Sequence, residues 1–494
     1  MNLLASLSSP LELENPTSLA FGALVAFVAM GLFRWFKDLH EPVRVLYHEH
    51  DLVWATCRYA DVFQKGYRPP WWVSFGSLFF SGTWHTLAHN IIREFCKQPE
   101  VKYEREFVRL KDGGTVGLDW AVSSRCPSSK ELLLSPDISD DSYPIVFLHH
   151  GLCGSSRSHY VLSAVNYFLK TQKYRVVVMV ARGCGEVPLT TSEGFNAARA
   201  DDIRQALNLV FERHPTSHVF GVGWSLGAGL MANYIGEEGN NCRLSGACVI
   251  SPCWDFMARS PWFPIWSKMF LGKSLVDYTK VNKEAFMACD KIDLDKGLAA
   301  AHVAEYDHHI IVQRHDKYET IDDYYRDASP LKVARNITIP TLSINSDDDP
   351  VCSVDGCPTD KAIMGPGLTV LRTKRGGHTS WAKHDSAHTS WMDEAILTWI
   401  NACNDNLIRL HNSSRNNFEN SSVSTSASSG SASEAGEENE NKKFEVIPNR
   451  RGSVDDPTSY RDDSLQPDVE KSTPLFPLVS AAAAAYLSYR IFRR

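Results

Sequence analysis

The chain has 494 residues, a net charge of −7, 43% hydrophobic residues and 22% charged residues, with room for one large domain and extensions. This composition is ordinary for a globular protein, and the lack of a dense basic run argues against nucleic acid as a partner. The 12 cysteines are scattered without a C-x-x-C pair, which favours a reduced, intracellular protein over a disulfide framework.

The first predicted element is an N-terminal transmembrane anchor at residues 17–36. Thr17 to Phe33 carry no charge, and this run reaches the short end of the lengths that span a bilayer. A basic and aromatic rim, Arg34-Trp35-Phe36-Lys37, follows it. A cleaved signal peptide is the alternative, but it requires a basic region before the apolar run, and no basic residue precedes Arg34.

The membrane topology stays open on sequence alone. The basic flank after the span favours a cytosolic catalytic domain on a single-pass protein, and we expect the endoplasmic reticulum or another endomembrane. Three N-x-S/T sequons, at Asn336, Asn412 and Asn420, would be glycosylation acceptors if the domain faced a lumen.

Between about residues 102 and 403, strand-like and helix-like runs alternate. Several of the strand-like runs are continuous in Val, Ile and Leu, as in parallel strands that are buried on both faces. The alternation predicts an α/β fold with a mostly parallel, eight-stranded sheet. The eight predicted strands are REFVRL, VGLDWAV, PIVFLHH, RVVVMVA, HVFGVG, GACVIS, PTLSIN and LTVLRT.

Three further regions interrupt or follow this pattern. Residues 254–329 are aromatic and helical in periodicity, and we expect a helical cap inserted late in the sheet. Residues 411–473 contain SSVSTSASSGSASEAGEENENKK, a composition too poor in apolar side chains to order the chain, so we predict disorder. The apolar and basic tail, 475–494, is either a second membrane contact or an alanine-rich helix.

The motif that carries chemistry is Gly223-Trp224-Ser225-Leu226-Gly227, which fits G-x-S-x-G. An apolar strand precedes it and a helix of small residues follows, which is the context of a nucleophile elbow. Such a turn exposes the serine hydroxyl beside a helix N-terminus, where developing negative charge is stabilised. A glycine-rich turn without a catalytic role is the alternative.

An oxyanion hole needs two N–H donors. Leu226, the residue after the nucleophile, supplies one in this type of turn. We assign the other to Leu152, after the strand that ends at His149-His150, with Cys153 as the alternative. The two histidines receive no catalytic role.

The base and the acid follow in the chain order Ser, acid, His that this fold uses. The strand TLSIN ends at Ser346-Asp347-Asp348-Asp349-Pro350, and among its acids we choose Asp349, then Asp348, then Asp347. The next strand ends at Gly376-Gly377-His378, where the glycines allow the imidazole to turn back over Ser225.

A series of ordered motifs runs from about Tyr67 to Asn401. They are Tyr67-Arg68-Pro69-Pro70-Trp71-Trp72, His85-Thr86, Asp112-Gly113-Gly114, Leu118-Asp119-Trp120, His150-Gly151-Leu152, Arg182-Gly183-Cys184-Gly185, Leu189-Thr190-Thr191, Asp202, the G-x-S-x-G motif, Asp348-Asp349-Pro350 and Gly376-Gly377-His378. In these motifs the chain resembles a known family, the membrane-anchored abhydrolase-domain proteins (AB hydrolase type 4). The family includes phospholipases, monoacylglycerol lipases and yeast ethyl-ester synthases/esterases. The resemblance implies an α/β-hydrolase domain at 67–403 and a Ser225, Asp349, His378 triad.

We therefore expect a serine hydrolase that cleaves acyl esters of lipids: a phospholipase, a monoacylglycerol lipase or a medium-chain ester hydrolase. No cofactor is expected, and no metal, because His308-His309 and His384 lack partners at ligand spacing. One alternative is an acyl-CoA:alcohol O-acyltransferase, since His302 to Asp307 fits an H-x₄-D pattern found in some acyltransferases. The other is a non-catalytic membrane scaffold.

Overall fold

The computed structural model describes residues 16–48, 51–96, 99–122, 143–258, 260, 263–386 and 388–425. Its centre is one sheet in the order β1-β9-β8-β7-β6-β4-β5-β3-β2. The strands are β1 (Arg44–Leu46), β2 (Tyr103–Arg109), β3 (Thr115–Ala121), β4 (Ile145–His149), β5 (Arg175–Val180), β6 (Val219–Trp224), β7 (Gly246–Ile250), β8 (Thr341–Ser346) and β9 (Leu368–Thr373).

The middle of the sheet is parallel, as predicted. Strands β5, β4, β6, β7, β8 and β9 pair in parallel, whereas β3 pairs antiparallel with β5 and with β2. Every residue of β4, β5, β6, β7 and β8 is buried. This burial on both faces explains their continuous apolar sequences.

The predicted count of eight strands is wrong, because the sheet has nine. The extra strand, β1, is only three residues long, forms one edge of the sheet and pairs antiparallel with β9. An ion pair between Arg44 and Asp347 fixes it there. So short a segment shows no periodicity of its own, and it precedes residue 67, where the hydrolase domain was predicted to begin.

Two hydrophobic cores lie on the two faces of the sheet. Successive residues of a strand point to opposite faces, so Phe147 belongs to one core and Val146 to the other. The first core includes Leu207 of α7 (Asp201–Arg213) and residues of α8 (Leu226–Glu238). The second includes Val165 of α6 (His159–Thr171) and Ile396 of α15 (Trp391–Thr425). The sheet is therefore covered by helices on both sides.

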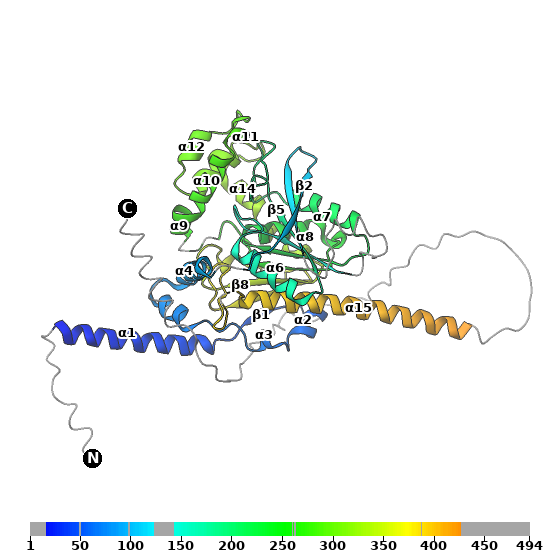
Figure 1. Ribbon diagram of the computed structural model, residues 1–494, viewed down its shortest axis with the longest axis horizontal. Coiled ribbons are helices and arrows are strands. Elements are labelled where there is room, and N and C mark those ends of the chain that lie inside the picture. Colours follow the sequence, from blue (N-terminus) through cyan, green and yellow to red (C-terminus); the bar gives the residue numbers. More distant parts are fainter. Residues whose placement is uncertain are drawn as a thin grey trace, which may run out of the picture.

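A group of helices is inserted between β7 and β8, in the range predicted for the cap. Figure 1 shows α9 to α12 gathered together beyond one end of the sheet. The helices are α9 (Phe263–Trp266), α10 (Gly272–Val281), α11 (Lys283–Met287), α12 (Leu294–Ala299), α13 (Val303–Asp307) and α14 (Ile321–Ala328), with π-helical turns at Ser267–Leu271 and His308–Val312.

The N-terminal helix, α1 (Pro16–Leu39), extends away from the rest of the molecule (Figure 1). Its segment Leu19–Asp38 has a mean hydropathy of 1.9 and is 6% buried. By length and composition this segment could cross a membrane, although a signal sequence passes the same test. The short helices α2 (Leu52–Cys57) and α3 (Asp61–Gln64) and the long α4 (Trp71–Phe95) follow it.

At the other end, α15 continues to Thr425. It therefore runs past residue 403, the predicted domain end, and into the range 411–473 that we predicted to be disordered. The remainder of that range and the tail 475–494 lie outside the described residues.

Candidate active site

Ser225 lies in the sharp turn between β6 and α8. Its backbone has φ 53° and ψ −120°, a conformation that is rare and strained for a residue with a side chain. A hydrogen bond of 2.8 Å from Ser225 N to Ile250 O ties the turn to β7. The strand and helix packed on each side thus maintain the strained turn.

The two glycines of the motif are required by close packing. A Cβ at Gly223 would collide with the backbone of Gly227 and Ala228. A Cβ at Gly227 would collide with the carbonyl oxygens of His149 and His150. Only residues without a side chain let strand, turn and helix approach this closely.

The structure brings Ser225, His378 and Asp349 together in one chain of hydrogen bonds. His378 Nε2 lies 2.7 Å from Ser225 Oγ. On the other side of the ring, Nδ1 lies 2.9 Å from Asp349 Oδ2 and 3.1 Å from Oδ1. This is hydroxyl, imidazole and carboxylate in the geometry of a nucleophile, its base and the group that orients the base.

Each of the three successive aspartates has a different set of partners. Asp349 is buried, and besides His378 it accepts hydrogen bonds from the amides of Val351 and Cys352, at 2.8 and 2.9 Å. Asp348 turns away and accepts from Gly377 N at 2.9 Å. Asp347 pairs with arginines of two neighbouring strands, Arg44 of β1 and Arg372 of β9.

The loop that carries His378 is held by a helix far away in the sequence. His378 N donates to Thr86 Oγ1 at 2.9 Å, and Thr86 Oγ1 donates to Gly82 O, both on α4. We predicted no contact between Thr86 and the His378 loop, although His85-Thr86 is one of the motifs that carry the family resemblance.

Leu226 and Leu152, the predicted oxyanion donors, both line the pocket that contains Ser225. Within the described residues, no acceptor takes a hydrogen bond from either backbone amide. The neighbouring Gly151 N is instead used by Tyr160 OH, at 2.9 Å. Cys153, the alternative donor, has φ 51°.

His149 and His150 are buried at the end of β4 and make structural contacts there. His150 Nε2 accepts from Ala181 N at 3.0 Å, and Nδ1 lies 2.7 Å from Gly151 O, so the ring ties the turn after β4 to the end of β5. Burial lowers the pKa of His149 to about 4, and burial together with His149 lowers the pKa of His150 to about 3. Both rings are therefore neutral near pH 7.

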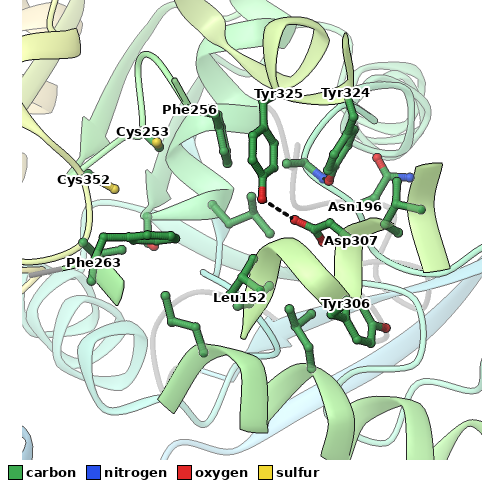
Figure 2. A pocket seen from close by; sticks show the side chains of 18 of the residues that line it. Leu152, Asn196, Cys253, Phe256, Phe263, Tyr306, Asp307, Tyr324, Tyr325 and Cys352 are labelled. Atoms are coloured by element: carbon green, nitrogen blue, oxygen red, sulfur yellow. Dashed lines mark hydrogen bonds between the residues drawn. The ribbon is translucent and has the colours of Figure 1, made fainter. Parts of the chain in front are cut away.

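A mostly apolar pocket of about 100 Å³ opens beside Ser225. Its walls come from the loops after the strands and from cap helices α10, α13 and α14. Figure 2 shows the sulfur atoms of Cys253 and Cys352 on one side and the Asp307 carboxylate, which accepts from Tyr325 OH at 3.1 Å, on the other. The pocket could hold an acyl chain beside the serine.

The H-x₄-D pattern at His302 to Asp307 is explained by local structure. His302 is exposed and caps α13 by accepting from Glu305 N, whereas Asp307 is buried in the pocket wall. The two side chains therefore act separately.

Among the described residues, one group of possible metal ligands stands out, Asp349, Cys352 and His378, whose donor atoms lie within 4.8 Å of one another. The hydrogen bonds described above already engage Asp349 and His378 with each other and with Ser225. A hydrogen bond with Cys253, together with burial, raises the pKa of Cys352 well above its ordinary value, so its thiol stays protonated and is a poor ligand. The three residues do not form a built metal site.

The sheet order, the cap after β7 and the serine turn together define the α/β-hydrolase class. Residues 140–358 match the family model described as "Serine aminopeptidase, S33". This match supports the α/β-hydrolase fold that the sheet order and the serine turn indicate.

Of three similar proteins, two carry a phospholipase or lipase name. "Protein abhd-3.2" of Caenorhabditis elegans is 29% identical over 69% of this chain and 86% of that protein. "Phospholipase ABHD3" of Homo sapiens is 27% identical over 65% of this chain and 77% of that protein. "Monoacylglycerol lipase" of Saccharomyces cerevisiae is 27% identical over 65% of this chain and 78% of that protein.

Proposed function

We propose that this protein hydrolyses carboxylic esters of lipids, with Ser225 as nucleophile, His378 as general base and Asp349 as the residue that orients the base. The proposal rests on one observation above all, the continuous chain of hydrogen bonds from Ser225 Oγ through the His378 ring to Asp349.

The chemistry follows from the order of the three groups along this chain of hydrogen bonds. His378 Nε2 takes the hydroxyl proton as Ser225 Oγ attacks the ester carbonyl, and Asp349 stabilises the imidazolium that forms. The imidazolium then gives its proton to the leaving alcohol, and an acyl-enzyme on Ser225 remains. Water, deprotonated by His378, hydrolyses this intermediate and regenerates the serine.

The charge that develops on the carbonyl oxygen needs donors. The amides of Leu226 and Leu152 are the proposed oxyanion hole, because both residues line the pocket beside Ser225 and neither amide has another acceptor within the described residues. The N-terminal end of α8 adds favourable potential.

Three features favour a lipid ester as the substrate. The pocket beside Ser225 is mostly apolar and covered by the cap. Two relatives are named as a phospholipase and a monoacylglycerol lipase. We propose phospholipids, monoacylglycerols and medium-chain esters as the candidate substrates of this protein. Helix α1 would anchor the protein as a single-pass membrane protein, and we propose an endomembrane such as the endoplasmic reticulum with a cytosolic domain.

Replacement of Ser225 tests the proposal directly. Full-length wild type should release free fatty acid from monoacylglycerol or phospholipid, and Ser225→Ala should lower the rate by roughly 10⁴-fold or more. Ser274→Ala, at an exposed serine on α10, is the matched control and should keep the wild-type rate. Unchanged hydrolysis by Ser225→Ala would refute the assignment.

The same acyl-enzyme could be resolved by an alcohol, as an acyltransferase requires. Supplying acyl-CoA with and without ethanol separates the two reactions. Free fatty acid should dominate in both samples, whereas ethyl ester as the main product would identify a transferase.

A further inference from the structure

A second cavity lies where the end of α1 meets the loop before His378. Its volume is about 290 Å³, and it is lined by the last turns of α1 and by Lys374 and Arg375. Arg34 and Lys37 contribute two more positive charges from α1, against the two carboxylates of Asp38 and Glu41.

The charges in this cavity are unevenly paired. Arg375 is neutralised by Asp38, at 3.2 Å, and by Asp348, at 3.6 Å. Within the part of the chain that the structure describes, Arg34 and Lys37 form no salt bridge. The Nε atom of Arg34 is buried and makes no hydrogen bond there. A buried guanidinium donor without an acceptor costs free energy unless an anion completes its hydrogen bonds.

The position of the cavity along α1 indicates which anion would complete the hydrogen bonds of Arg34. The side chains of Met30 and Phe33, which also line the cavity, are 56% and 72% exposed and belong to the apolar part of the helix. Arg34 and Lys37 lie at the end of the candidate span Leu19–Asp38. In a bilayer this is the depth of the headgroups, where basic side chains meet lipid phosphates.

We propose that this cavity binds the phosphate group of a membrane phospholipid, with Arg34 and Lys37 as its charged contacts. Met30 and Phe33 then lie beside the first carbons of the acyl chains. The guanidinium of Arg34 supplies paired N–H donors of the geometry that phosphate oxygens accept. The inference rests on the proposed anchoring of α1 but goes beyond the proposed reaction, because this site is not the one that contains Ser225.

The cavity adjoins the loop that carries the catalytic histidine. Arg375 directly precedes Gly376, Gly377 and His378. Asp348 accepts from Gly377 N and faces Arg375. A phospholipid bound here would therefore hold the His378 side of the active site against the membrane that supplies the substrate.

The ordinary alternative is a basic flank that is simply solvated at the membrane surface. Such a flank attracts anionic lipids without a defined site, so neutralising any two nearby charges would weaken binding similarly. A built site predicts a loss confined to Arg34 and Lys37.

Native mass spectrometry of the full-length protein in detergent can separate these two outcomes. The probe is ether-linked phosphatidylglycerol, which has no acyl ester, so binding is measured independently of hydrolysis. Arg34→Gln/Lys37→Gln should bind it roughly tenfold or more weakly than wild type. Lys280→Gln/Lys296→Gln, which removes two exposed charges from the cap, should bind as wild type does. Equal affinities in all three proteins, or equal losses in both variants, would overturn the site.

Two further arms identify the chemistry and its source. Ether-linked glucosyl diglyceride, which lacks phosphate, should not occupy the site, and equal binding of it would overturn phosphate recognition. Excess glycerol 3-phosphate should leave the bound lipid in place. Displacement of the bound lipid by this excess would assign the site to soluble phosphate esters and overturn the lipid source.

Failure of this inference is distinguishable from failure of its premises. Wild type and the Arg34/Lys37 variant should both float with vesicles of the glucosyl diglyceride, and a wild type that stays in solution would refute the anchor. Both should hydrolyse p-nitrophenyl butyrate at similar rates, because this soluble ester needs Ser225 but no headgroup contact.

Discussion

At the residue scale, the proposed mechanism depends on which of three adjacent aspartates reaches the imidazole. Asp349 is the residue at hydrogen-bond distance from His378 Nδ1, and two backbone amides hold its carboxylate. Asp348 has a partner of its own in the His378 loop, and Asp347 has partners on β1 and β9. The three carboxylates thus have separate tasks.

Neutralising these carboxylates one at a time should show the difference. Asp349→Asn should lower kcat by roughly 10³- to 10⁴-fold, because an amide cannot stabilise the imidazolium and favours the wrong tautomer. Asp347→Asn removes the same charge two residues away and should keep kcat within a fewfold of wild type. Measured kcat values for an ester substrate check this, and a larger loss in Asp347→Asn than in Asp349→Asn would contradict the assignment.

The sequence identified the candidate triad because each member follows a strand in the order typical of the fold. It ranked Asp349 above its neighbours but offered no physical reason for their separate contacts, since these depend on β1 and α4. Thr86 shows the same limit. It meets His378 N across 292 positions of chain, and no local pattern marks such a contact.

At the element scale, the cap is fastened to the segment that follows β5. Tyr278 of α10 donates to Arg182 O at 3.0 Å and accepts from Phe195 N at 3.2 Å. Asn282, just after α10, donates to Gly183 O at 3.0 Å. These bonds explain how helices of modest length are held in place over Ser225.

Glu193 adds a charged contact to the same junction, and its ionisation should appear in the pH dependence of stability. Arg314 Nε donates to it at 2.7 Å. Burial alone would raise the pKa of Glu193, but His315 and Arg314 outweigh it and lower the pKa from 4.5 to about 2. Because the folded pKa is depressed, the stabilisation is complete above about pH 4.5 and is lost as the pH falls toward 2.

Chemical unfolding between pH 6 and 2 tests this prediction. Wild type should be more stable than Glu193→Gln above pH 4.5, and the difference should shrink as the pH approaches 2. Glu284→Gln, at an exposed carboxylate on α11, should follow wild type throughout. A difference between wild type and Glu193→Gln that grows on acidification would contradict the assigned role.

The elements also show which parts of the fold the sequence could predict. Strands β4 to β8 were recognisable because burial on both faces leaves long apolar runs. The ninth strand, β1, was missed because three residues are too few to show a hydrophobic periodicity. Its position is set by its pairing with β9 and by the ion pair between Arg44 and Asp347. The cap was placed from the break in alternation, but the order of its helices around the pocket depends on tertiary contacts.

At the scale of the whole molecule, the proposed anchor, headgroup site and active site follow one another from α1 to the cap. Helix α1 projects from the body at the side where α4 supports the His378 loop (Figure 1). Asp38 at the end of α1 is bonded to Arg375 of that loop. The arrangement suits an enzyme that takes its substrate from the membrane holding it.

The central claim is that Ser225 is the reacting nucleophile, and covalent labelling tests it most directly. Full-length wild type should react with a fluorophosphonate probe and lose activity, and peptide mass spectrometry should locate one adduct on Ser225. His378→Ala should slow the labelling, because the proton must leave Ser225 Oγ for Nε2. An active wild type that stays unlabelled at Ser225, or that is inactivated by an adduct on another serine, would contradict the account.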